Sequence, residues 1–352
     1  MLVNNQINEQ NQNVGFDNEK YFSAQKKAIL ERVDKFSKLY LEFGGKLLFD
    51  MHATRVLPGY EGDNKLKLIE SMKESAEVLY CINATELELQ HKWGETNLTL
   101  DKLALKETMG LTKRGVSVLG IVVCKQNGEK KSTEFKREVE KHGGKVFFTK
   151  AIKGYPNDLK KVFGKNGFDA QEYIPSTKKI IIVAGAGANS GKMFTCLSQI
   201  YQDYKRGINS GYAKWETFPI WNLPIDHPVN IAYEAATADI LDKIKYDKLH
   251  EKAYKEKAVN YNRDVENFRL LKKITKQFVP KENYMHSYKS PTNMGVNMAS
   301  EGIINDEIVR GAAKKEILRR YGVYKEKYKT KETSKKTISR MNQLLKKAKI
   351  KK

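Results

Sequence analysis

Short apolar runs alternate with longer amphipathic stretches along the N-terminal half of the chain. The apolar runs occupy residues 39–43, 78–83, 116–124, 145–149 and 179–184. The amphipathic stretches, which have helical spacing, lie at residues 20–35, 64–76, 99–112 and 132–142. This alternation is typical of buried parallel strands that are covered by helices on both faces. We therefore predict an α/β fold with a mainly parallel sheet in a three-layer arrangement.

The C-terminal half has a different pattern. Residues 211–230 contain Trp215, Phe218, Trp221 and three prolines, which predict an irregular loop. Helical spacing returns at residue 231, and a chain of 352 residues is long enough for two cores. We predict four segments, namely a disordered leader at 1–15, an α/β domain at 16–240, a helical domain at 241–324 and a lysine-rich helix or tail at 325–352.

The composition is that of a globular, water-soluble protein. Hydrophobic residues make up 40% and charged residues 30% of the chain. No apolar run approaches the roughly 18 to 20 residues that a membrane span needs, and the N-terminus shows no signal-peptide pattern. Cys81, Cys124 and Cys196 include no CxxC pair, so we expect neither a disulfide framework nor a structural zinc site. These features predict a cytoplasmic protein that does not contact a membrane.

Basic charge is concentrated at the C-terminus. The net charge is +22, and residues 325–352 contain twelve Lys or Arg against two Glu. Such a tail would attract nucleic acid electrostatically. Its only aromatic side chain is Tyr328, however, so it offers little for base stacking. We therefore expect a solvated basic helix, with nucleic-acid binding as the less favoured alternative.

The strongest local motif is a glycine-rich loop between a predicted strand and a predicted helix. It reads Gly185-Ala-Gly187-Ala-Asn-Ser190-Gly191-Lys192. Glycines let backbone N–H groups approach an anion, and a helix N-terminus adds unpaired N–H groups and a positive dipole end. Lys192 would add a full positive charge. The motif predicts a phosphate-binding loop, with ATP or another nucleotide and Mg²⁺ as the expected ligands.

This loop departs from both common phosphate-binding patterns. In GxxxxGK followed by Ser or Thr, Ala186 stands at the first glycine and Met193 at the hydroxyl position that meets magnesium. In GxGxxG, Ser190 replaces the third glycine. A tight strand-to-helix turn with an exposed lysine is therefore the alternative. No hydrophobic run ending in Asp follows at the usual distance, so we expect Glu234 and Asp239 to be substitute metal ligands.

A second polar cluster follows the first predicted strand. Gly44 and Gly45 end that strand, and Lys46, His52 and Arg55 come close behind. Ligands of doubly wound α/β folds bind at the carboxyl ends of the strands. There, Lys46 and Arg55 would add positive charge for an anion. The alternative is that the histidine and the arginine are structural.

A third cluster lies in the predicted irregular loop and the helix that follows it. Glu216, Asp226 and His227 supply groups for acid, base or metal chemistry. Asp239 follows on the predicted helix. We take Glu216, His227 and Asp239 as candidate catalytic residues, while each such segment alone is more often structural.

Six segments carry a resemblance to a known family. They read YLEFGGKLLFDMHATRVLPGYEGDNKLKL, AIKGYPNDL, GANSGKMFTCLSQIYQD, INSGYAKWETFPIWNLPIDHPVNIAYEAATADI, VNYNRDVENF and SPTNMGVNM. The chain resembles the bacterial domain-of-unknown-function family eighteen-forty-six, for which the resemblance implies no established activity. The family's loop is rich in proline and glycine and ends in SGK, and this chain has Ala186 and Ala188 where prolines are common. Members usually carry a further α/β domain after the helical region, which we expect this chain to lack.

Together these features predict a nucleotide-binding enzyme that performs phosphoryl transfer or the ATP-dependent activation of a small substrate. The loop would hold the phosphates, and the second and third clusters would supply positive charge, metal ligands and a base. The alternative is a non-catalytic protein that binds a nucleotide or phosphometabolite and contacts a partner through its helical region. The expected partner is a small phosphorylated ligand, and homo-oligomer formation stays open.

Overall fold

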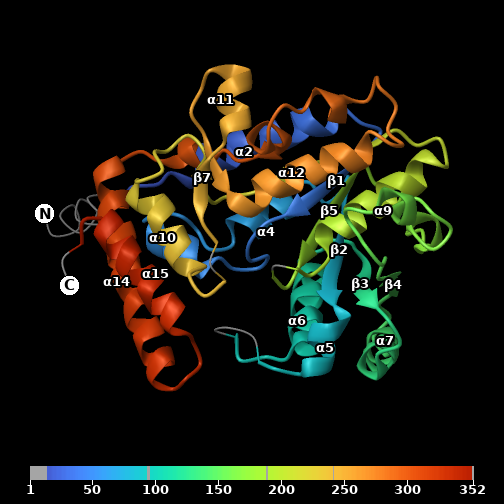
Figure 1. The fold of residues 1–352 in the computed structure, drawn as a ribbon, viewed down its shortest axis with the longest axis horizontal. Coiled ribbons are helices and arrows are strands. Elements are labelled where there is room, and N and C mark those ends of the chain that lie inside the picture. Colours follow the sequence, from blue (N-terminus) through green and yellow to red (C-terminus); the bar gives the residue numbers. More distant parts are fainter. Residues whose placement is uncertain (1–13, 93–95, 188, 241, 351–352) are drawn as a thin grey trace, which may run out of the picture.

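The computed structural model describes residues 14–92, 96–187, 189–240 and 242–350 (Figure 1). Its main element is a seven-stranded sheet in which each strand runs parallel to its neighbours. The strands lie in the order β4 (Val146–Lys150), β3 (Val118–Gln126), β2 (Ala76–Asn83), β5 (Ile180–Gly185), β1 (Lys38–Phe43), β6 (Ser210–Trp215) and β9 (Gly295–Val296). The predicted α/β fold with a parallel sheet is confirmed.

Helices connect and cover these strands. Those before β6 are α2 (Asn18–Val33), α3 (Met51–Val56), α4 (Asn64–Glu70), α5 (Ala84–Leu89), α6 (Leu100–Lys113), α7 (Lys130–Lys141), α8 (Leu159–Val162), the 3₁₀ helix η2 (Phe168–Ala170) and α9 (Lys192–Tyr204). Those after β6 are α10 (Pro228–Ala236), α11 (Lys248–Tyr254), α12 (Asn262–Thr275), η3 (Tyr284–Ser287), α13 (Pro291–Met294), η4 (Ala299–Gly302), α14 (Asp306–Lys329) and α15 (Lys335–Lys347). A small antiparallel pair, β7 (Ile244–Tyr246) and β8 (Val259–Tyr261), lies outside the main sheet.

The five predicted strands are confirmed as β1 to β5, with their ends displaced by no more than two residues. The prediction of an irregular loop at residues 211–230 is wrong at its beginning, because Ser210–Trp215 forms β6. Gly211 and Lys214 interrupt the apolar alternation of that segment, so a strand signal is weak. β9 was also missed, since a strand of two residues leaves no periodic pattern.

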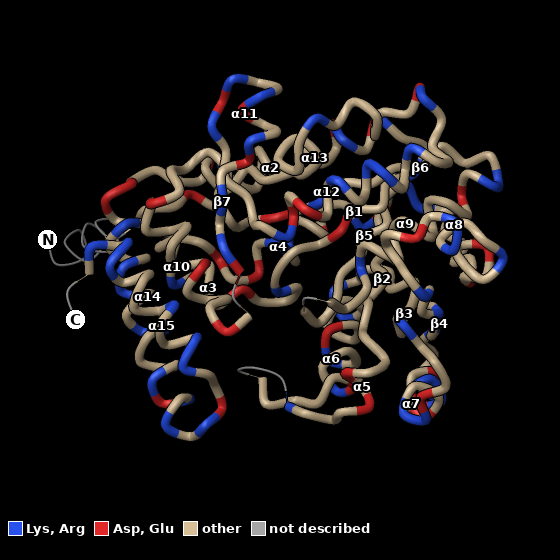
Figure 2. Tube along the Cα trace, viewed as in Figure 1, with Lys and Arg blue, Asp and Glu red and all other residues tan. Residues whose placement is uncertain are grey.

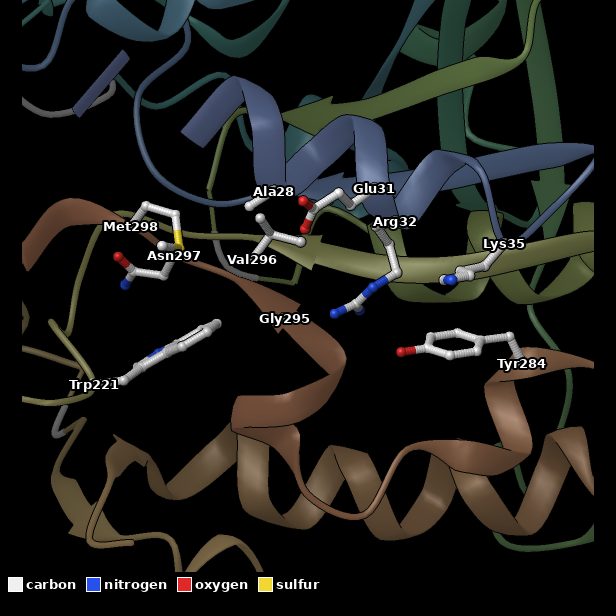
Figure 3. Close-up of a pocket in the computed structure, with 10 residues that line it drawn as sticks. All are labelled: Ala28, Glu31, Arg32, Lys35, Trp221, Tyr284, Gly295, Val296, Asn297 and Met298. Carbon is white, nitrogen blue, oxygen red and sulfur yellow. The ribbon is translucent and has the colours of Figure 1, made fainter. Parts of the chain in front are cut away.

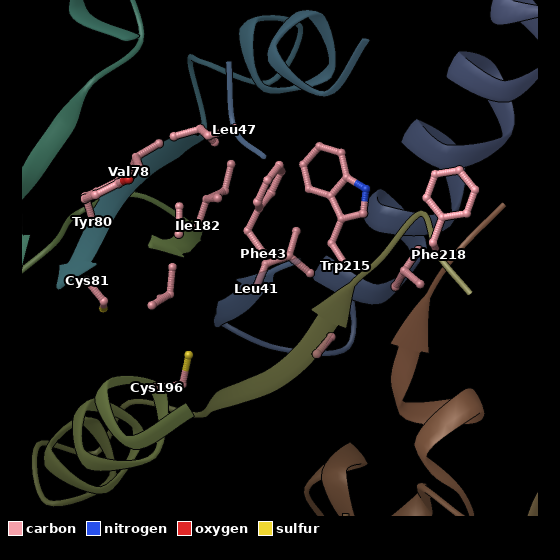
Figure 4. Close-up of a cluster of buried hydrophobic side chains, with 14 of the residues drawn as sticks. Leu41, Phe43, Leu47, Val78, Tyr80, Cys81, Ile182, Cys196, Trp215 and Phe218 are labelled. Atoms are coloured by element: carbon pink, nitrogen blue, oxygen red, sulfur yellow. The ribbon is translucent and has the colours of Figure 1, made fainter. Parts of the chain in front are cut away.

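Alternating residues of the central strands face two different helical layers. Tyr40 of β1 donates to Asp203 of α9 at 3.0 Å, which places α9 on one face of the sheet. On the opposite face, Lys65 of α4 lies over the ring of Phe43, 5.5 Å from its centroid. Figure 4 shows the buried apolar side chains around β1, β2, β5 and β6, including Phe43 and Trp215. The sheet is therefore the middle of three layers, as the pattern of buried runs predicts.

The connections reverse direction between two neighbouring strands. β2 leads through α5 and α6 to β3 on one side, whereas β5 leads through α9 to β6 on the other. The carboxyl ends of β2 and β5 therefore form a topological switch point, where open α/β sheets bind their ligands. The glycine-rich loop leaves β5 at this point.

The C-terminal helices pack together at one end of the molecule. α14 contacts α3, α10 and α15, and Figure 1 shows α10, α14 and α15 side by side. Met341, Leu344 and Leu345 of α15 are buried, so one face of this lysine-rich helix joins the core. β9 lies beyond the expected boundary near residue 240 but belongs to the main sheet. The division into domains itself stays a prediction, and most of the expected leader lies outside the described residues.

Charge is distributed along the whole molecule. Figure 2 shows Lys and Arg on α7, on α11 and on the C-terminal helices, interspersed with acidic positions. None of the described helices is both long enough and apolar enough to span a membrane.

Candidate functional site

The glycine-rich loop joins the carboxyl end of β5 to the first turn of α9. The ammonium of Lys192 donates to the carbonyl oxygen of Gly187 at 2.9 Å and lies 3.2 Å from Oγ of Ser190. Ser190 in turn donates to the same carbonyl at 3.0 Å. Both partners of Lys192 are neutral, and it forms no ion pair with any described residue. Its positive charge is held over the loop by hydrogen bonds alone.

Two glycines bring this loop against the ends of the strands. A β-carbon on Gly185 would lie 2.5 Å from Oγ of Ser190, and one on Gly191 would lie 2.5 Å from Sγ of Cys124. Gly191 also has a φ of +95°, which favours glycine. It is the N-cap of α9, and no side chain caps the helix there. The first turn of α9 therefore keeps unpaired N–H groups that can donate hydrogen bonds to an anion.

Asn83 ties the loop to the neighbouring strand. Asn83 is the last residue of β2, and its side-chain amide donates to the carbonyl oxygen of Asn189 at 3.2 Å. The other side-chain atom, Oδ1, accepts from the N–H of Thr85 at 2.9 Å. Because both ends of this amide are bonded, Asn83 orients the loop. Its role was missed from the sequence, where a strand-terminal asparagine is simply a helix cap.

A buried ionic cluster lies at the carboxyl end of β6. The ammonium of Lys214 lies 2.6 Å from Oε1 of Glu216 and 2.5 Å from Oδ1 of Asp264 on α12. Tyr212 donates to Glu42 of β1 at 2.7 Å, on the same face of the sheet. Three carboxylates thus surround one ammonium, which leaves an excess of negative charge when all are ionised.

The pKa values of Glu216 and Lys214 are both raised in this cluster, for different reasons. Burial raises the pKa of Glu216 to about 7, against the opposing attraction of Lys214. Burial alone would lower the pKa of Lys214, but Asp264 and Glu216 hold it well above its ordinary value. Glu216 therefore exchanges a proton near neutral pH, as a general base or acid must.

Gly44 places the loop and the ionic cluster on one edge of the sheet. A β-carbon on Gly44 would lie 2.8 Å from Oε1 of Glu216, so this carboxylate lies over the end of β1. β1 lies between β5 and β6 in the sheet. Gly185 and Glu216, at the ends of those two strands, are therefore separated by about 10 Å, or two strand spacings. The edge therefore carries the glycine-rich loop at one end and the carboxylate of Glu216 at the other.

Tyr155, a half-buried residue whose hydroxyl is fully buried, lies near Glu42. The hydroxyl of Tyr155 has no hydrogen-bond partner among the described residues. Burial raises its pKa, and the charge of Glu42 raises it further, which places the two groups close together. Tyr155 was missed as a site residue, although AIKGYPNDL is one of the segments that carry the family resemblance.

The second predicted cluster divides between two places. Lys46 is exposed just after β1, near the candidate edge. His52 and Arg55 lie on α3, which packs against α10 and α14. His52 lies 3.4 Å from Glu316 of α14, with its ring against Phe218 and Tyr233. For His52 the contacts therefore favour the structural alternative.

Lys65 and Asp50 form a further ion pair beside the glycine turn. The two groups are 2.9 Å apart, and Lys65 also lies 3.3 Å from the carbonyl oxygen of Gly44. Burial alone would raise the pKa of Asp50, but the charge of Lys65 holds it below its ordinary value. This pair supports the Gly44 turn from the face opposite α9.

The remaining residues of the third cluster contact the C-terminal helices. His227 caps α10 and lies 2.8 Å from Asp306 of α14, and burial lowers its pKa. Glu234 lies 2.5 Å from Arg340 and 2.9 Å from Lys347, both on α15. Asp239 accepts from the hydroxyl of Tyr324 at 3.1 Å.

No hydrogen bond or ion pair joins His227, Glu234 or Asp239 to the glycine-rich loop within the described part of the chain. Figure 1 shows α10 beside α14 on one side of the molecule, whereas α9 lies on the other side, packed against β1, β5 and β6. Their predicted catalytic and metal-binding roles stay predictions. No group of three or more His, Cys, Asp or Glu with metal-binding geometry occurs among the described residues.

A pocket of about 430 Å³ lies beside β9, at the edge of the sheet (Figure 3). Trp221 and Tyr284 line it together with Arg32 of α2. The guanidinium of Arg32 is already bonded to the carbonyl oxygens of Met294 and Asn293, at 2.7 and 3.1 Å. The pocket is separated from Glu216 by β9, whose Val296 accepts from the N–H of Glu216 at 3.1 Å.

Comparisons with known proteins give a family without an assigned activity. A family model described as domain of unknown function DUF1846, N-terminal, matches residues 14–349. The UPF0371 protein of Clostridium tetani (strain Massachusetts / E88) is 46% identical over 324 residues, which cover 91% of this chain and 64% of that protein. The UPF0371 protein of Clostridium botulinum (strain Kyoto / Type A2) is 46% identical over 307 residues, covering 87% of this chain and 61% of its own length. The chain therefore spans less than two thirds of the length of these relatives.

Proposed function

The chain belongs to the family of the domain of unknown function DUF1846, and we propose that it binds a small phosphorylated ligand at the glycine-rich loop. ATP or another nucleotide is the leading candidate. The observation that carries this proposal is the position of the loop at the topological switch point, with Lys192 unpaired by any described carboxylate. An exposed lysine on a merely structural turn would need neither the close packing of Gly191 nor the bond from Asn83.

The phosphate group would be bound by the first turn of α9. Its uncapped N–H groups and the positive end of the helix dipole favour an anion. Lys192 would exchange its bond to the carbonyl oxygen of Gly187 for a charge-assisted bond to a phosphate oxygen, which is the stronger of the two.

We propose in addition that the ligand extends along the edge toward Glu216 and that the protein is an enzyme. A ligand with its phosphate at the loop would place a group about 10 Å away next to Glu216. In phosphoryl transfer, Glu216 would accept the proton of an acceptor hydroxyl bound beside it. The oxygen of that hydroxyl would bond to the terminal phosphorus of the nucleotide, while the bond from that phosphorus to the diphosphate leaving group breaks. Lys214 and Asp264 would position the carboxylate.

We expect magnesium to accompany a bound nucleotide, and Glu234 and Asp239 stay its predicted ligands. The contacts of Glu234 and Asp239 give their oxygen atoms other partners, and neither lies at the edge of the sheet that carries the loop. The proposed steps therefore do not depend on these two residues.

The test is a calorimetric titration of ATP, with and without magnesium, into the wild type and the Lys192→Ala variant. Lys113→Ala is a matched control, because Lys113 is exposed on α6 and forms no ion pair with a described residue. We expect binding in the wild type and the control, and a loss of at least tenfold in affinity for Lys192→Ala. If ATP and a panel of phosphorylated metabolites all fail to bind the wild type, the proposal is wrong.

One observation favours the non-catalytic alternative. Glu216 is buried, and both it and Asp264 are bonded to Lys214, so the cluster also serves as a structural bridge between β6 and α12. If the wild type turns over the ligand and Glu216→Gln binds the ligand with the same affinity but without turnover, the protein is an enzyme. Binding without turnover in the wild type supports the alternative.

A further inference from the structure

A groove of about 400 Å³ runs along the C-terminal half of α12. Leu249 and Phe268 contribute apolar side chains to its lining. All the charged residues that line it are basic, and they are Arg269, Lys272, Lys273, Lys276 and Lys289. We call this feature the α12 groove. An apolar floor surrounded by cations is a surface suited to an anion.

None of these five cations forms an ion pair with a residue in the described ranges. Elsewhere on the surface, exposed lysines commonly do, as Lys131 with Glu134 and Lys329 with Glu326 show. In the α12 groove, Arg269 and Lys273 are four residues apart on one helix, as are Lys272 and Lys276. Like charges at this spacing repel each other. The groove therefore holds positive charge that no acidic residue of the described ranges neutralises by an ion pair.

Two hydrogen bonds hold Lys272 in place among the other four cations of the groove. Its ammonium donates to the carbonyl oxygens of His286 and Tyr288, at 2.9 and 3.0 Å. Burial lowers the pKa of Lys272, and the neighbouring charges of Lys276 and Lys289 lower it further. A negatively charged ligand would relieve this repulsion. The four exposed cations around Lys272 could then each approach this ligand without breaking an ion pair.

The size of the groove indicates which anion it would take. Arg269 and Lys276 are separated by seven residues of helix, or about 10 Å along its axis. A single small anion would contact only part of this span, and a nucleic acid would extend well beyond a groove of about 400 Å³. We propose that the α12 groove binds a compact ligand with several linked phosphates.

This site is distinct from the glycine-rich loop and from the ionic cluster, although α12 contributes side chains both to that cluster and to the groove. Asp264 in the first turn of α12 pairs with Lys214 in the ionic cluster. Lys272 lies eight residues later, about 12 Å along the helix. The proposal therefore does not depend on the function of the loop.

The experiment measures the binding of inorganic tripolyphosphate to the full chain by calorimetry at low ionic strength. The variant combines Arg269→Gln, Lys273→Gln and Lys276→Gln, all at exposed positions. The matched control combines Lys102→Gln, Lys106→Gln and Lys113→Gln, which remove the same charge from exposed positions of α6. We expect a saturable site in the wild type and the control, and at least a tenfold loss of affinity in the α12 variant.

Four outcomes would overturn the proposal. The first is the absence of saturable binding, and the second is an equal loss in both triple variants, which would indicate a general effect of net charge. The third is tighter binding of a single-stranded RNA oligonucleotide of equal charge, lost in the α12 variant, which would assign the groove to nucleic acid. The fourth is a loss of tripolyphosphate affinity in Lys192→Ala while the α12 variant binds as the wild type does. This result would assign the tripolyphosphate to the glycine-rich loop.

Discussion

The carboxylate of Glu216 lies against the α-carbon of Gly44, where β1 and β6 end side by side. A β-carbon at Gly44 would lie 2.8 Å from Oε1 of Glu216 and 3.2 Å from the carbonyl oxygen of Trp215. The N–H of Gly44 also donates to that carbonyl at 2.9 Å. The absence of a side chain at one residue therefore allows the acidic group of another to reach the edge of the sheet.

We expect Gly44→Ala to destabilise the protein by about 1–3 kcal/mol, because the new methyl group would displace Glu216 or the backbone. Gly322→Ala is the control, since a β-carbon there would have no neighbour within 4 Å and the residue lies in α14. It should stabilise the protein by about 0.5–1 kcal/mol, because alanine favours the helix. Urea denaturation of both variants measures the difference. Equal effects would show that Gly44 is not sterically constrained.

Glu216 should make stability depend on pH. Its pKa is raised from 4.5 to about 7 in the folded protein, so between these pH values the folded state retains a proton that the unfolded chain releases. The stability that this proton contributes is complete below pH 4.5 and is lost as the pH rises through 7. Glu216→Gln removes this dependence. Relative to the variant, the wild type should lose roughly 1–3 kcal/mol between pH 5 and 8 in denaturant titrations. Parallel pH profiles would contradict the raised pKa.

Gly191 should tolerate no side chain. We expect Gly191→Ala to cost about 2–4 kcal/mol, because its methyl group would meet Cys124 at 2.5 Å and its φ of +95° disfavours alanine. Gly207 separates these two causes, since its φ is +74° but a β-carbon there would have open space. Gly207→Ala should therefore cost only about 1 kcal/mol. Thermal and urea denaturation measure both effects, and a similar cost in the two variants would rule out the steric argument.

Glu234 should hold the last helix in place. Its buried carboxylate contacts Arg340 and Lys347 and accepts from the N–H of Ile244 at 2.9 Å. Glu234→Ala would leave these groups without their common partner, and we expect a loss of about 3 kcal/mol together with faster tryptic cleavage in α15. The control Glu326→Ala breaks an exposed pair with Lys329 and should cost less than about 1 kcal/mol. Unchanged cleavage of α15 in Glu234→Ala would contradict this role.

The sequence alone determined the layers of the fold, because that information is local. Strands such as Ile180–Gly185 are buried on both faces and therefore read as continuous apolar runs. The glycine-rich loop was also recognisable, since it follows such a run and begins a helix. The sequence did not reveal β6, in which Lys214 is a polar residue inside a strand, because its partners lie on other elements.

Only the tertiary structure decided which polar residues meet. Glu216 and His227 are close in sequence, yet Glu216 contacts Lys214 and Asp264 whereas His227 contacts Asp306 at the start of α14. A parallel sheet brings together the ends of strands that are distant in the chain, and its strand order cannot be read from hydrophobic periodicity. The edge formed by Gly185, Gly44 and Glu216 therefore depends on β1 lying between β5 and β6. That placement results from long-range packing, which no local pattern encodes.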